Sequence, residues 1–471
     1  MADHKLKGEE NVEDFLQHLY TDISTDARYS AELPDMIDAT REMVERIVAK
    51  AFWPHKKELE HEGVTNIKIS DAGSMAEGTK ICDPDEFDFV IAFTYSPGVL
   101  KTLPPSNERD ILFANCTVKP NDRRFCQIGK GKNNELFLSK DFRTLNFLRL
   151  ESALLKVSEA GPIRRGKNSL CLDIESVRNY GMKGPAFKLH KLVKWCSPEG
   201  DKNLFISIDL VPAIAIYDEI FADEFPAFIQ GCSCAEHLIH KPDHFLLLPV
   251  KSIEILFEEL LYTKGDDQHR EAKSEFASRN YMVSLSEYER DIMKTWQCEK
   301  SIYHNWFVCY KLMKCFGDLD HNFDVLVRID PNDEGLEGHI PDLTISNQGS
   351  HESFASYTWK ILVFEMASKE TSKLTLKQCF DRLTALFDKG NLDLDKSKVL
   401  EVNSFWWPSV ISEEIHLDMR DSKRYKPYVD GIIKFKEILN EIIYDPSYKY
   451  PHYKGKLKEL FPKLASYFHG K

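Results

Sequence analysis

The spacing of apolar residues predicts helices and strands in alternation through the first half of the chain. Residues 34–60 carry apolar side chains close to helical spacing, which predicts one long amphipathic helix that can bend at Pro54. The following IKISDAGSMAEGT predicts a short strand leading into a Gly-Ser turn, and DEFDFVIAF alternates acidic and apolar residues as a half-buried strand does. LFISIDLVPAIAI at 204–216 predicts a third strand, closed by Pro212.

The second half of the chain is predicted to be mainly helical. From about residue 275 long helical patterns dominate, including IYHNWFVCYKLMKCF and FKEILNEIIYD. There is no repeat period and no Ser/Gly-rich linker, so the parts of the chain are expected to share an interface. The predicted fold class is therefore α+β.

Composition narrows the class of protein. The 471 residues are 42% hydrophobic and 29% charged, which excludes collagenous, low-complexity and wholly disordered chains. No apolar run approaches the roughly 18 residues that a membrane span needs, and no apolar segment follows the first charged residues. We therefore expect no membrane partner and a cytoplasmic location. The eleven cysteines, an odd number, favour free thiols in a reducing compartment.

Charge is distributed unevenly along the chain. The formal net charge of −13 argues against a protein that coats nucleic acid with its whole surface. Residues 118–202, however, carry 18 Lys and Arg against nine Asp and Glu, a local balance of +9, so the other 386 residues carry −22. This stretch can form either a basic face that contacts phosphates or a solvated face that balances an acidic body. A shorter basic stretch with interleaved aromatic residues begins at Asp445.

Three carboxylates are the strongest candidates for chemistry. Glu86 and Asp88 are two residues apart in an extended segment, which places both side chains on one face of a strand. Asp209 lies in an apolar strand, where burying an unpaired charge would be costly. If the two strands are neighbours, the three carboxylates can bind a pair of hard divalent cations such as Mg2+. Taken alone, an E-x-D pair is more often a solvated face, and a buried strand Asp is more often hydrogen-bonded structure.

A glycine-serine turn precedes the carboxylate pair. Gly73 and Ser74 follow the first short strand, and 11 residues separate Ser74 from Glu86, which suits a strand, a short helix and the next strand. Backbone N–H groups and a hydroxyl at such a turn can bind a phosphate. A Gly-Ser turn alone is a weak signal, but its combination with the carboxylates is much more specific.

Together these segments resemble a known family. GSMAEGTKICDPDEFDFVIAF and SIDLVPAI are similar to the catalytic strands of the nucleotidyltransferase superfamily, and specifically of the Mab-21 family, which includes cyclic GMP-AMP synthase and the receptors like it. Downstream, SLSEYERDIM resembles a serine-rich segment before a helix, CYKLMKCF a lysine-bearing helix, and SFASYTWKILVFEM a segment with a base-stacking tyrosine. The segments occur in family order over about 300 residues.

The resemblance implies a bilobed nucleotidyltransferase fold of class α+β, with a mixed β-sheet core, a long N-terminal spine helix and a mainly helical C-terminal lobe. It implies a flexible N-terminus at 1–25, the core at 26–270 and a Mab-21-type lobe at 271–471. The implied activity is synthesis of cyclic GMP-AMP or a related cyclic dinucleotide, a second messenger of innate immunity. The substrates would be ATP, GTP or other nucleoside triphosphates, with two Mg2+ or Mn2+ ions as cofactors.

Carried over residue by residue, the resemblance also implies roles. Glu86, Asp88 and Asp209 would be metal ligands, and Asp209 could accept the proton of the attacking hydroxyl. The nucleotides would be contacted by Gly73, Ser74, Ser284, Ser286, Glu289, Lys314, Ser356 and Tyr357. Lys314 would bind phosphates and Tyr357 would stack on a base. Without the resemblance, Tyr357 fits a core aromatic equally well, and Lys314 fits a solvated helix lysine better.

The chain departs from the family at the zinc-bearing thumb of the vertebrate enzyme. Cys298, His304 and Cys309 are present in the corresponding interval, but the adjacent cysteine pair is missing, so no structural zinc is expected there. Met282 stands where the vertebrate enzyme has an arginine near the guanine, so base preference is not implied.

A second cysteine- and histidine-rich segment, CSCAEHLIH, has spacing compact enough to bind a metal, although ordinary thiols and surface histidines fit it better. Its candidate ligands are Cys232, Cys234, His237 and His240.

The missing thumb changes which activating ligand is expected. Relatives without it include receptors that respond to double-stranded RNA, so a double-stranded nucleic acid, RNA rather than DNA, is the implied activator, and its binding could assemble a homo-oligomer. The candidate contacts in the basic stretch are Arg123, Arg124, Lys130, Lys132, Arg164, Arg165 and Lys167. Two alternatives remain open. One is a catalytically inactive Mab-21-like scaffold that binds a partner, and the other is a linear oligonucleotide synthase with the same metal site.

Overall fold

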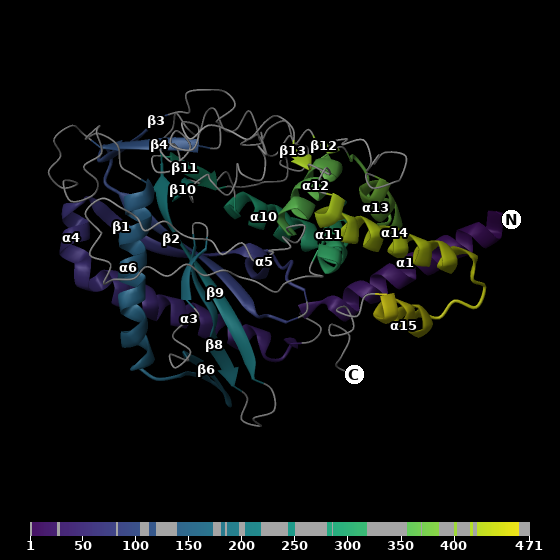
Figure 1. Ribbon diagram of the computed structural model, residues 1–471, viewed down its shortest axis with the longest axis horizontal. Helices are drawn as coiled ribbons and strands as arrows, with labels where there is room; N and C mark the ends of the chain where they lie inside the picture. Colours follow the sequence, from purple (N-terminus) through teal and green to yellow (C-terminus); the bar gives the residue numbers. More distant parts are fainter. Residues whose placement is uncertain are drawn as a thin grey trace.

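The computed structural model describes residues 2–25, 29–81, 83–103, 113–118, 139–172, 180–183, 186–196, 203–217, 244–249, 280–284, 286–317, 356–368, 370–385, 400–402, 415–417 and 422–460. Helices and a curled mixed sheet make up this part of the chain, which confirms the α+β class (Figure 1).

The predicted long amphipathic helix is confirmed, and it ends where a proline interrupts it. Helix α3 (Leu33–Phe52) is followed by the 3-10 turn η1 (Trp53–His55) and by α4 (Lys56–His61). Pro54 lies in η1, because its missing N–H and its ring do not suit a helix interior. Helix α3 buries its apolar stripe and packs against α6 (Ser139–Ser158).

In the described part of the chain, eleven strands form one sheet. In chain order they are β1 (Val64–Ala72), β2 (Glu86–Tyr95), β3 (Leu100–Leu103), β4 (Phe113–Val118), β5 (Ile163–Arg165), β6 (Asn168–Leu172), β7 (Tyr180–Lys183), β8 (Ala186–Cys196), β9 (Leu204–Ile216), β10 (Phe245–Pro249) and β11 (Asn280–Ser284). The main order is β3-β4-β11-β10-β9-β8-β6-β5, and β1-β2 branches from β9 while β7 pairs with β8. Among the described strand pairs, only β2 and β9 run parallel.

Strand β9 lies at the centre of this sheet, and Pro212 does not close it as predicted. β9 pairs with β2 along one edge, with β8 through Leu210 and with β10 from Ile214 onward. Pro212 lies at the change from β8 to β10, where neither antiparallel neighbour is paired with β9 in the described register. Because proline has no N–H to donate, this is the part of a central strand where it disturbs the hydrogen-bond ladder least.

The second half of the described chain is mainly helical, as predicted. Its helices are α10 (Ser286–Gln297), α11 (His304–Gly317), α12 (Ser356–Ser368), α13 (Leu376–Thr384), α14 (Ser422–Tyr444) and α15 (Tyr450–Leu460). Two short strands, β12 (Leu400–Val402) and β13 (Ile415–Leu417), pair with each other. Figure 1 shows these helices gathered at one end of the molecule.

The N-terminus differs from the flexible segment that we expected. Residues Ala2–Ile23 form helix α1, which packs among the C-terminal helices and buries one apolar face (Figure 1). The carboxylate of Glu13 accepts hydrogen bonds from the backbone N–H groups of Leu376 and Lys377, both at 2.9 Å, and so caps the start of α13. A helix with partners on several elements is ordered by tertiary contacts that its own sequence does not reveal.

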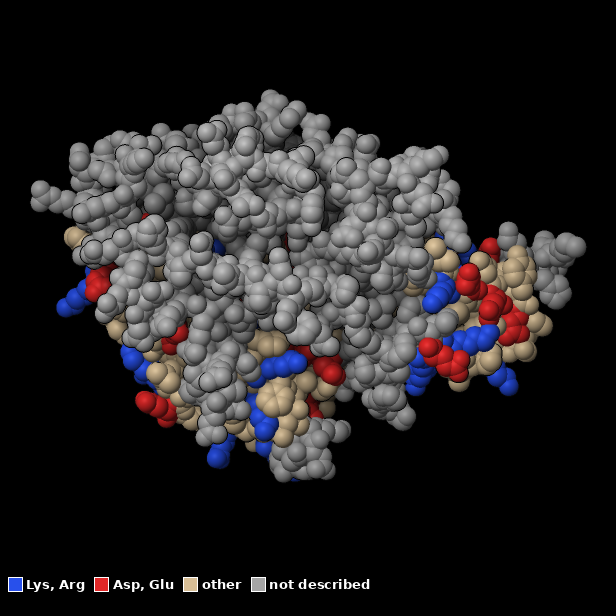
Figure 2. Space-filling model, viewed as in Figure 1, with Lys and Arg blue, Asp and Glu red and all other residues tan. Residues whose placement is uncertain are grey.

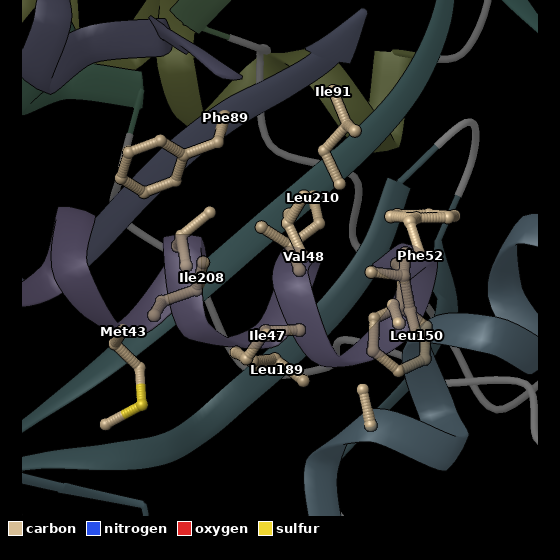
Figure 3. Close-up of a cluster of buried hydrophobic side chains, with 14 of the residues drawn as sticks. Met43, Ile47, Val48, Phe52, Phe89, Ile91, Leu150, Leu189, Ile208 and Leu210 are labelled. Carbon is tan, nitrogen blue, oxygen red and sulfur yellow. The ribbon is translucent and has the colours of Figure 1, made fainter. Parts of the chain in front are cut away.

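Two large hydrophobic cores divide the described residues. One is formed by α3, α6 and the sheet, where Ile47 and Phe52 meet strand residues such as Ile91 and Leu210 (Figure 3). The other is formed by α1 and α10–α15, with Ile81 as its contact from the chain segment before β2. Contacts between the two halves include those of Lys314 and, through Lys360, of Glu289 with residues near α5 (Gly73–Ala76).

Candidate functional site

The alternation of strands β2 and β9 places the three predicted carboxylates on one face of the sheet. Phe87 and Phe89 of β2 point into the core with α3, as do Ile208 and Leu210 of β9, so the intervening residues point the opposite way. In the parallel register Asp88 is paired with Asp209, and Glu86 is paired with Ser207. Two carboxylates are therefore direct neighbours on adjacent strands, and the third, Glu86, lies two residues before Asp88 at the start of β2.

Beyond the carboxylates the same face of the sheet is small and apolar. The cluster there contains Val90, Ala92, Ala213, Ala215, Leu246 and Leu248. The carboxylates thus lie at the polar end of an otherwise apolar face.

A lysine that the sequence analysis missed lies among these carboxylates. Lys188 of β8 is paired with Asp209 across the antiparallel ladder, and its side chain is buried. Its ammonium donates a hydrogen bond to Glu86 Oε1 at 2.9 Å and lies 3.7 Å from Asp209 Oδ1. The available signal was its place between Phe187 and Leu189, because a charged residue between two core residues of one strand must point to the other face.

Burial and the proximity of like charges determine the electrostatics of the site. Burial, together with the charges of Glu86 and Asp209, raises the pKa of Asp88 to about 8. Burial alone would lower the pKa of Lys188, but the negative charges of Glu86 and Asp209 raise it above its ordinary value. The cluster therefore favours additional positive charge.

Hard divalent cations match this donor set. Three carboxylates from two adjacent strands supply only oxygen ligands, and mutual repulsion between them is the effect that a cation relieves. Among the residues that the structure describes, no three His, Cys, Asp or Glu side chains are already spaced as a metal site. At present the ammonium of Lys188 lies between two of the carboxylates.

The predicted Gly-Ser turn lies directly against Asp88. Gly73 begins the short helix α5 (Gly73–Ala76) with a φ of +65°, and a Cβ added to it would lie 1.8 Å from Asp88 Oδ2. Glycine is therefore required twice, for its backbone conformation and for the approach of the carboxylate. The carbonyl of Ser74 accepts hydrogen bonds from the N–H groups of Thr79 at 2.9 Å and Lys80 at 3.0 Å, which closes the turn after α5.

Replacing Gly73 by alanine should show both requirements. We expect Gly73→Ala to lower the free energy of unfolding by about 2–4 kcal/mol, because the positive φ alone costs about 1–2 kcal/mol and Asp88 must also move. Gly161→Ala is the matched control, since Gly161 has a φ of +77° but nothing within 4 Å of an added Cβ. Urea unfolding of both variants measures the difference, and equal losses would contradict a steric role for Asp88.

Lys314 lies beside this turn. Its buried ammonium donates to the carbonyl of Thr79 at 3.1 Å, and Lys311 donates to the carbonyl of Gly78 at 3.3 Å. Both lysines thus reach from α11 to the turn that follows α5. Lys314 is a buried lysine rather than a solvated one, and its contact with substrate phosphates stays a prediction.

Glu289 belongs to a buried ion triad that spans the two halves of the protein. Lys360 of α12 donates to Glu77 at 2.7 Å and to Glu289 of α10 at 3.0 Å. All three side chains are at least nine-tenths buried. Burial alone would lower the pKa of Lys360, but Glu289 and Glu77 raise it well above its ordinary value. The triad fixes the C-terminal end of α5 to two helices of the other half.

The remaining predicted nucleotide contacts are only partly described. Ser284 and Ser286 lie at the junction of β11 and α10, and the hydroxyl of Ser284 donates to that of Ser286 at 2.9 Å. Ser356 and Tyr357 begin α12, but the positions of their side chains lie outside the description. Met282 lies in β11, paired with Leu248.

The predicted basic contacts divide into exposed and paired residues. Arg164 and Lys167 are exposed at the β5–β6 hairpin, whereas Arg165 donates to Glu42 Oε2 at 2.8 Å. This hydrogen bond lowers the pKa of Glu42. The other four candidates, Arg123, Arg124, Lys130 and Lys132, lie outside the described residues.

In the described part of the basic stretch after Asp445, two lysines are paired with acidic residues. Lys454 pairs with Asp22 of α1 at 2.7 Å, and Lys456 pairs with Glu441 of α14. Figure 2 shows blue and red side chains mixed at the end of the molecule where α15 lies.

The candidate zinc ligands do not come together in the described part of the chain. Cys298 is exposed, Cys309 is buried, and the ring of His304 lies 3.3 Å from the carbonyl of Trp296. Burial raises the pKa of the Cys309 thiol. The second set, Cys232, Cys234, His237 and His240, lies outside the described residues.

Comparisons with known proteins do not indicate a function, so a proposal has to rest mainly on the geometry of the carboxylate cluster. No protein-family model matches the chain, and no curated protein sequence matches it significantly. No helix in the described part of the chain is both long and apolar enough to cross a bilayer.

Proposed function

We propose that this protein is a metal-dependent nucleotidyltransferase that joins nucleoside triphosphates into a cyclic dinucleotide. The observation that carries the proposal is the parallel register of β2 and β9, which makes Asp88 and Asp209 neighbours and puts Glu86 on the same face. The approach of Gly73 to Asp88 supports it, because the Gly-Ser turn then lies directly beside the carboxylates.

The side chains present match the needs of phosphoryl transfer. Such reactions require positioning and charge neutralisation more than covalent chemistry from the protein. Two Mg2+ or Mn2+ ions, when bound, would activate a ribose hydroxyl and stabilise the leaving pyrophosphate. Glu86, Asp88 and Asp209 would hold these ions, and Asp209 would accept the hydroxyl proton. Two successive transfers in one site would close the ring.

We also propose the bilobed nucleotidyltransferase arrangement as the finer description of the fold. Its support is the segment β1-α5-β2 with β9 alongside, together with two separate hydrophobic cores that meet near α5. The triad of Glu77, Lys360 and Glu289 joins those halves directly behind the turn.

Product analysis tests the activity. Purified protein is incubated with the four labelled triphosphates, Mg2+ or Mn2+, and double-stranded RNA or DNA, and the products are identified by mass and by nuclease digestion. We expect a cyclic dinucleotide, absent from the double variant Glu86→Gln/Asp209→Asn. A linear product would support oligonucleotide synthesis in place of cyclisation. The absence of any product under every condition would reject the proposed enzyme activity.

An inactive scaffold is the second candidate, and one observation favours it. Lys188 already neutralises part of the carboxylate cluster, as a protein without bound metal would require. Calorimetry that detects triphosphate binding without turnover, under every activator tested, would support the scaffold over the enzyme.

The proposed activator is double-stranded RNA, bound at the exposed end of the β5–β6 hairpin. Charge reversal of Arg164 and Lys167 together should weaken RNA binding about tenfold and lower the slope of log affinity against log salt by about 2, because two phosphate contacts are lost. Lys294→Glu/Lys300→Glu changes the charge equally on exposed residues of the helical half and should leave the slope unaltered. Binding titrations at several salt concentrations measure it, and equal slopes in both variants would remove the hairpin from the interface.

A further inference from the structure

Lys188 is buried beside two carboxylates of the proposed metal site. Its neighbours Phe187 and Leu189 pack in the core of the sheet, on the face opposite to the lysine side chain. The side chain itself is buried on the opposite face and ends between Glu86 and Asp209, at 2.9 and 3.7 Å.

The other cation near the cluster occupies a different position. Lys80 pairs with Asp85 at 2.8 Å and lies 3.9 Å from Glu86 Oε2, whereas Lys188 lies against the other oxygen of that carboxylate, Oε1. Lys188 is paired with a carboxylate of each strand, Glu86 of β2 and Asp209 of β9. Each ammonium carries a single charge, whereas a divalent cation in the cluster would supply two.

We propose that Lys188 is an internal counter-cation. Its ammonium occupies the carboxylate cluster before a divalent metal ion binds, and the incoming ion must displace this ammonium. Lys188 is then a positioning residue that sets the affinity of the site for metal. The inference rests on the proposed function, because the metal is the one proposed there. A lysine suits this role, since its ammonium is a compact charge on a flexible stem that can leave without disturbing the backbone.

This arrangement links metal binding to the nucleotide. Displacing Lys188 leaves a buried ammonium in need of an anionic partner, and the phosphates of a bound triphosphate are such a partner. Metal should therefore bind weakly to the protein alone and more tightly in the presence of a non-hydrolysable triphosphate. Such coupling would limit metal binding in the absence of substrate.

Mn2+ binding to the full chain without nucleotide tests the proposal. Free Mn2+ is measured by electron paramagnetic resonance for the wild type, Lys188→Met, Lys188→Arg and Lys194→Met. We expect Lys188→Met to bind Mn2+ about 10- to 100-fold more tightly, because a positive charge within 4 Å of the ligands is removed. Lys188→Arg keeps the charge and should stay within about threefold of the wild type.

Lys194→Met is the matched control on the same strand. Its ammonium lies over the ring of Phe205, 5.7 Å from the centroid, and none of its described contacts involves the three carboxylates, so metal affinity should be that of the wild type. Unchanged or weaker Mn2+ binding by Lys188→Met would overturn the proposal. A similar gain in Lys194→Met would overturn it too, since that gain would come from general charge.

Folding of Lys188→Met gives a second readout. If the variant is unfolded in EDTA by circular dichroism, Mn2+ should restore its spectrum, and failure to restore it would overturn the inference. The proposed function has a separate test, because it fails when the wild type makes no nucleotide product. A protein without that activity can still bind Mn2+ in the predicted order, so the two failures are distinguishable.

Discussion

Asp88→Asn is expected to reduce nucleotidyl transfer by at least about 1,000-fold, which corresponds to about 4 kcal/mol of transition-state stabilisation. Asp88 is the carboxylate paired directly with Asp209 across the parallel strands, and Gly73 lies against its Oδ2. An amide of the same shape keeps these contacts but removes a charge that metal ligation requires. Initial rates with saturating Mg2+ and triphosphates measure the loss.

In the absence of metal, Asp88→Asn should make the free energy of unfolding less dependent on pH. The pKa of Asp88 is about 8 in the folded protein and about 3.9 in the unfolded chain, so folding takes up a proton between these values. Stability of the wild type in EDTA should therefore fall as pH rises from 4 to about 8, and Asp88→Asn should remove this decline. Urea unfolding at pH 6 and pH 9 tests the sign.

Asp85→Asn is the control for both measurements. Asp85→Asn is the same chemical change three residues away, on a side chain that is half exposed. It should retain wild-type activity within about threefold and should not alter the pH dependence. Equal losses in the two variants, or more than a tenth of wild-type activity in Asp88→Asn, would contradict the metal-ligand role.

Lys360→Met should lower the free energy of unfolding by about 3–5 kcal/mol. The substitution leaves Glu77 and Glu289 without the ammonium that lies 2.7 and 3.0 Å from them, in a region from which water is largely excluded. Ionised carboxylates in that position lose their solvation and gain nothing in return. Urea unfolding at pH 7.5 measures the change.

Two further variants separate this cause from lost packing. Lys360→Met/Glu77→Gln/Glu289→Gln removes all three charges and should recover at least half of the loss, because neutral amides are less costly to bury. Lys377→Met breaks an exposed pair with Asp381 on one turn of α13 and should cost less than about 1 kcal/mol. Equal effects at positions 360 and 377 would show that burial of the triad is energetically unimportant.

Local elements were predictable from the sequence because they depend on short-range periodicity. The alternation around Asp88 and Asp209 fixed the face on which each lies, and the helix before Pro54 followed from its apolar stripe. The face of Lys188 could be predicted from Phe187 and Leu189, but its carboxylate partners could not, because they depend on how β8 pairs with β9. That register shifts between Leu189 and Val193, and no local pattern encodes the shift.

Long-range partners account for the other differences. The apolar stripe of α1 has helical spacing, but its partners lie several hundred residues away, so the segment was predicted to be flexible. Glu289 and Lys314 hydrogen-bond to Lys360 and to the carbonyl of Thr79, which no local pattern predicts, and their contacts with a nucleotide stay predictions. The sequence alone does not reveal whether a charged side chain is buried with a partner.

The docking of α1 has a consequence for biosynthesis. Helix α1 is translated several hundred residues before α14 and α15, yet Phe15 packs against Phe435 of α14 and Tyr450 of α15. This part of its apolar face stays uncovered until those helices have been made. A chaperone that holds amphipathic helices would protect α1 during that interval, and deleting residues 2–25 would leave the matching apolar faces of α14 and α15 prone to aggregation.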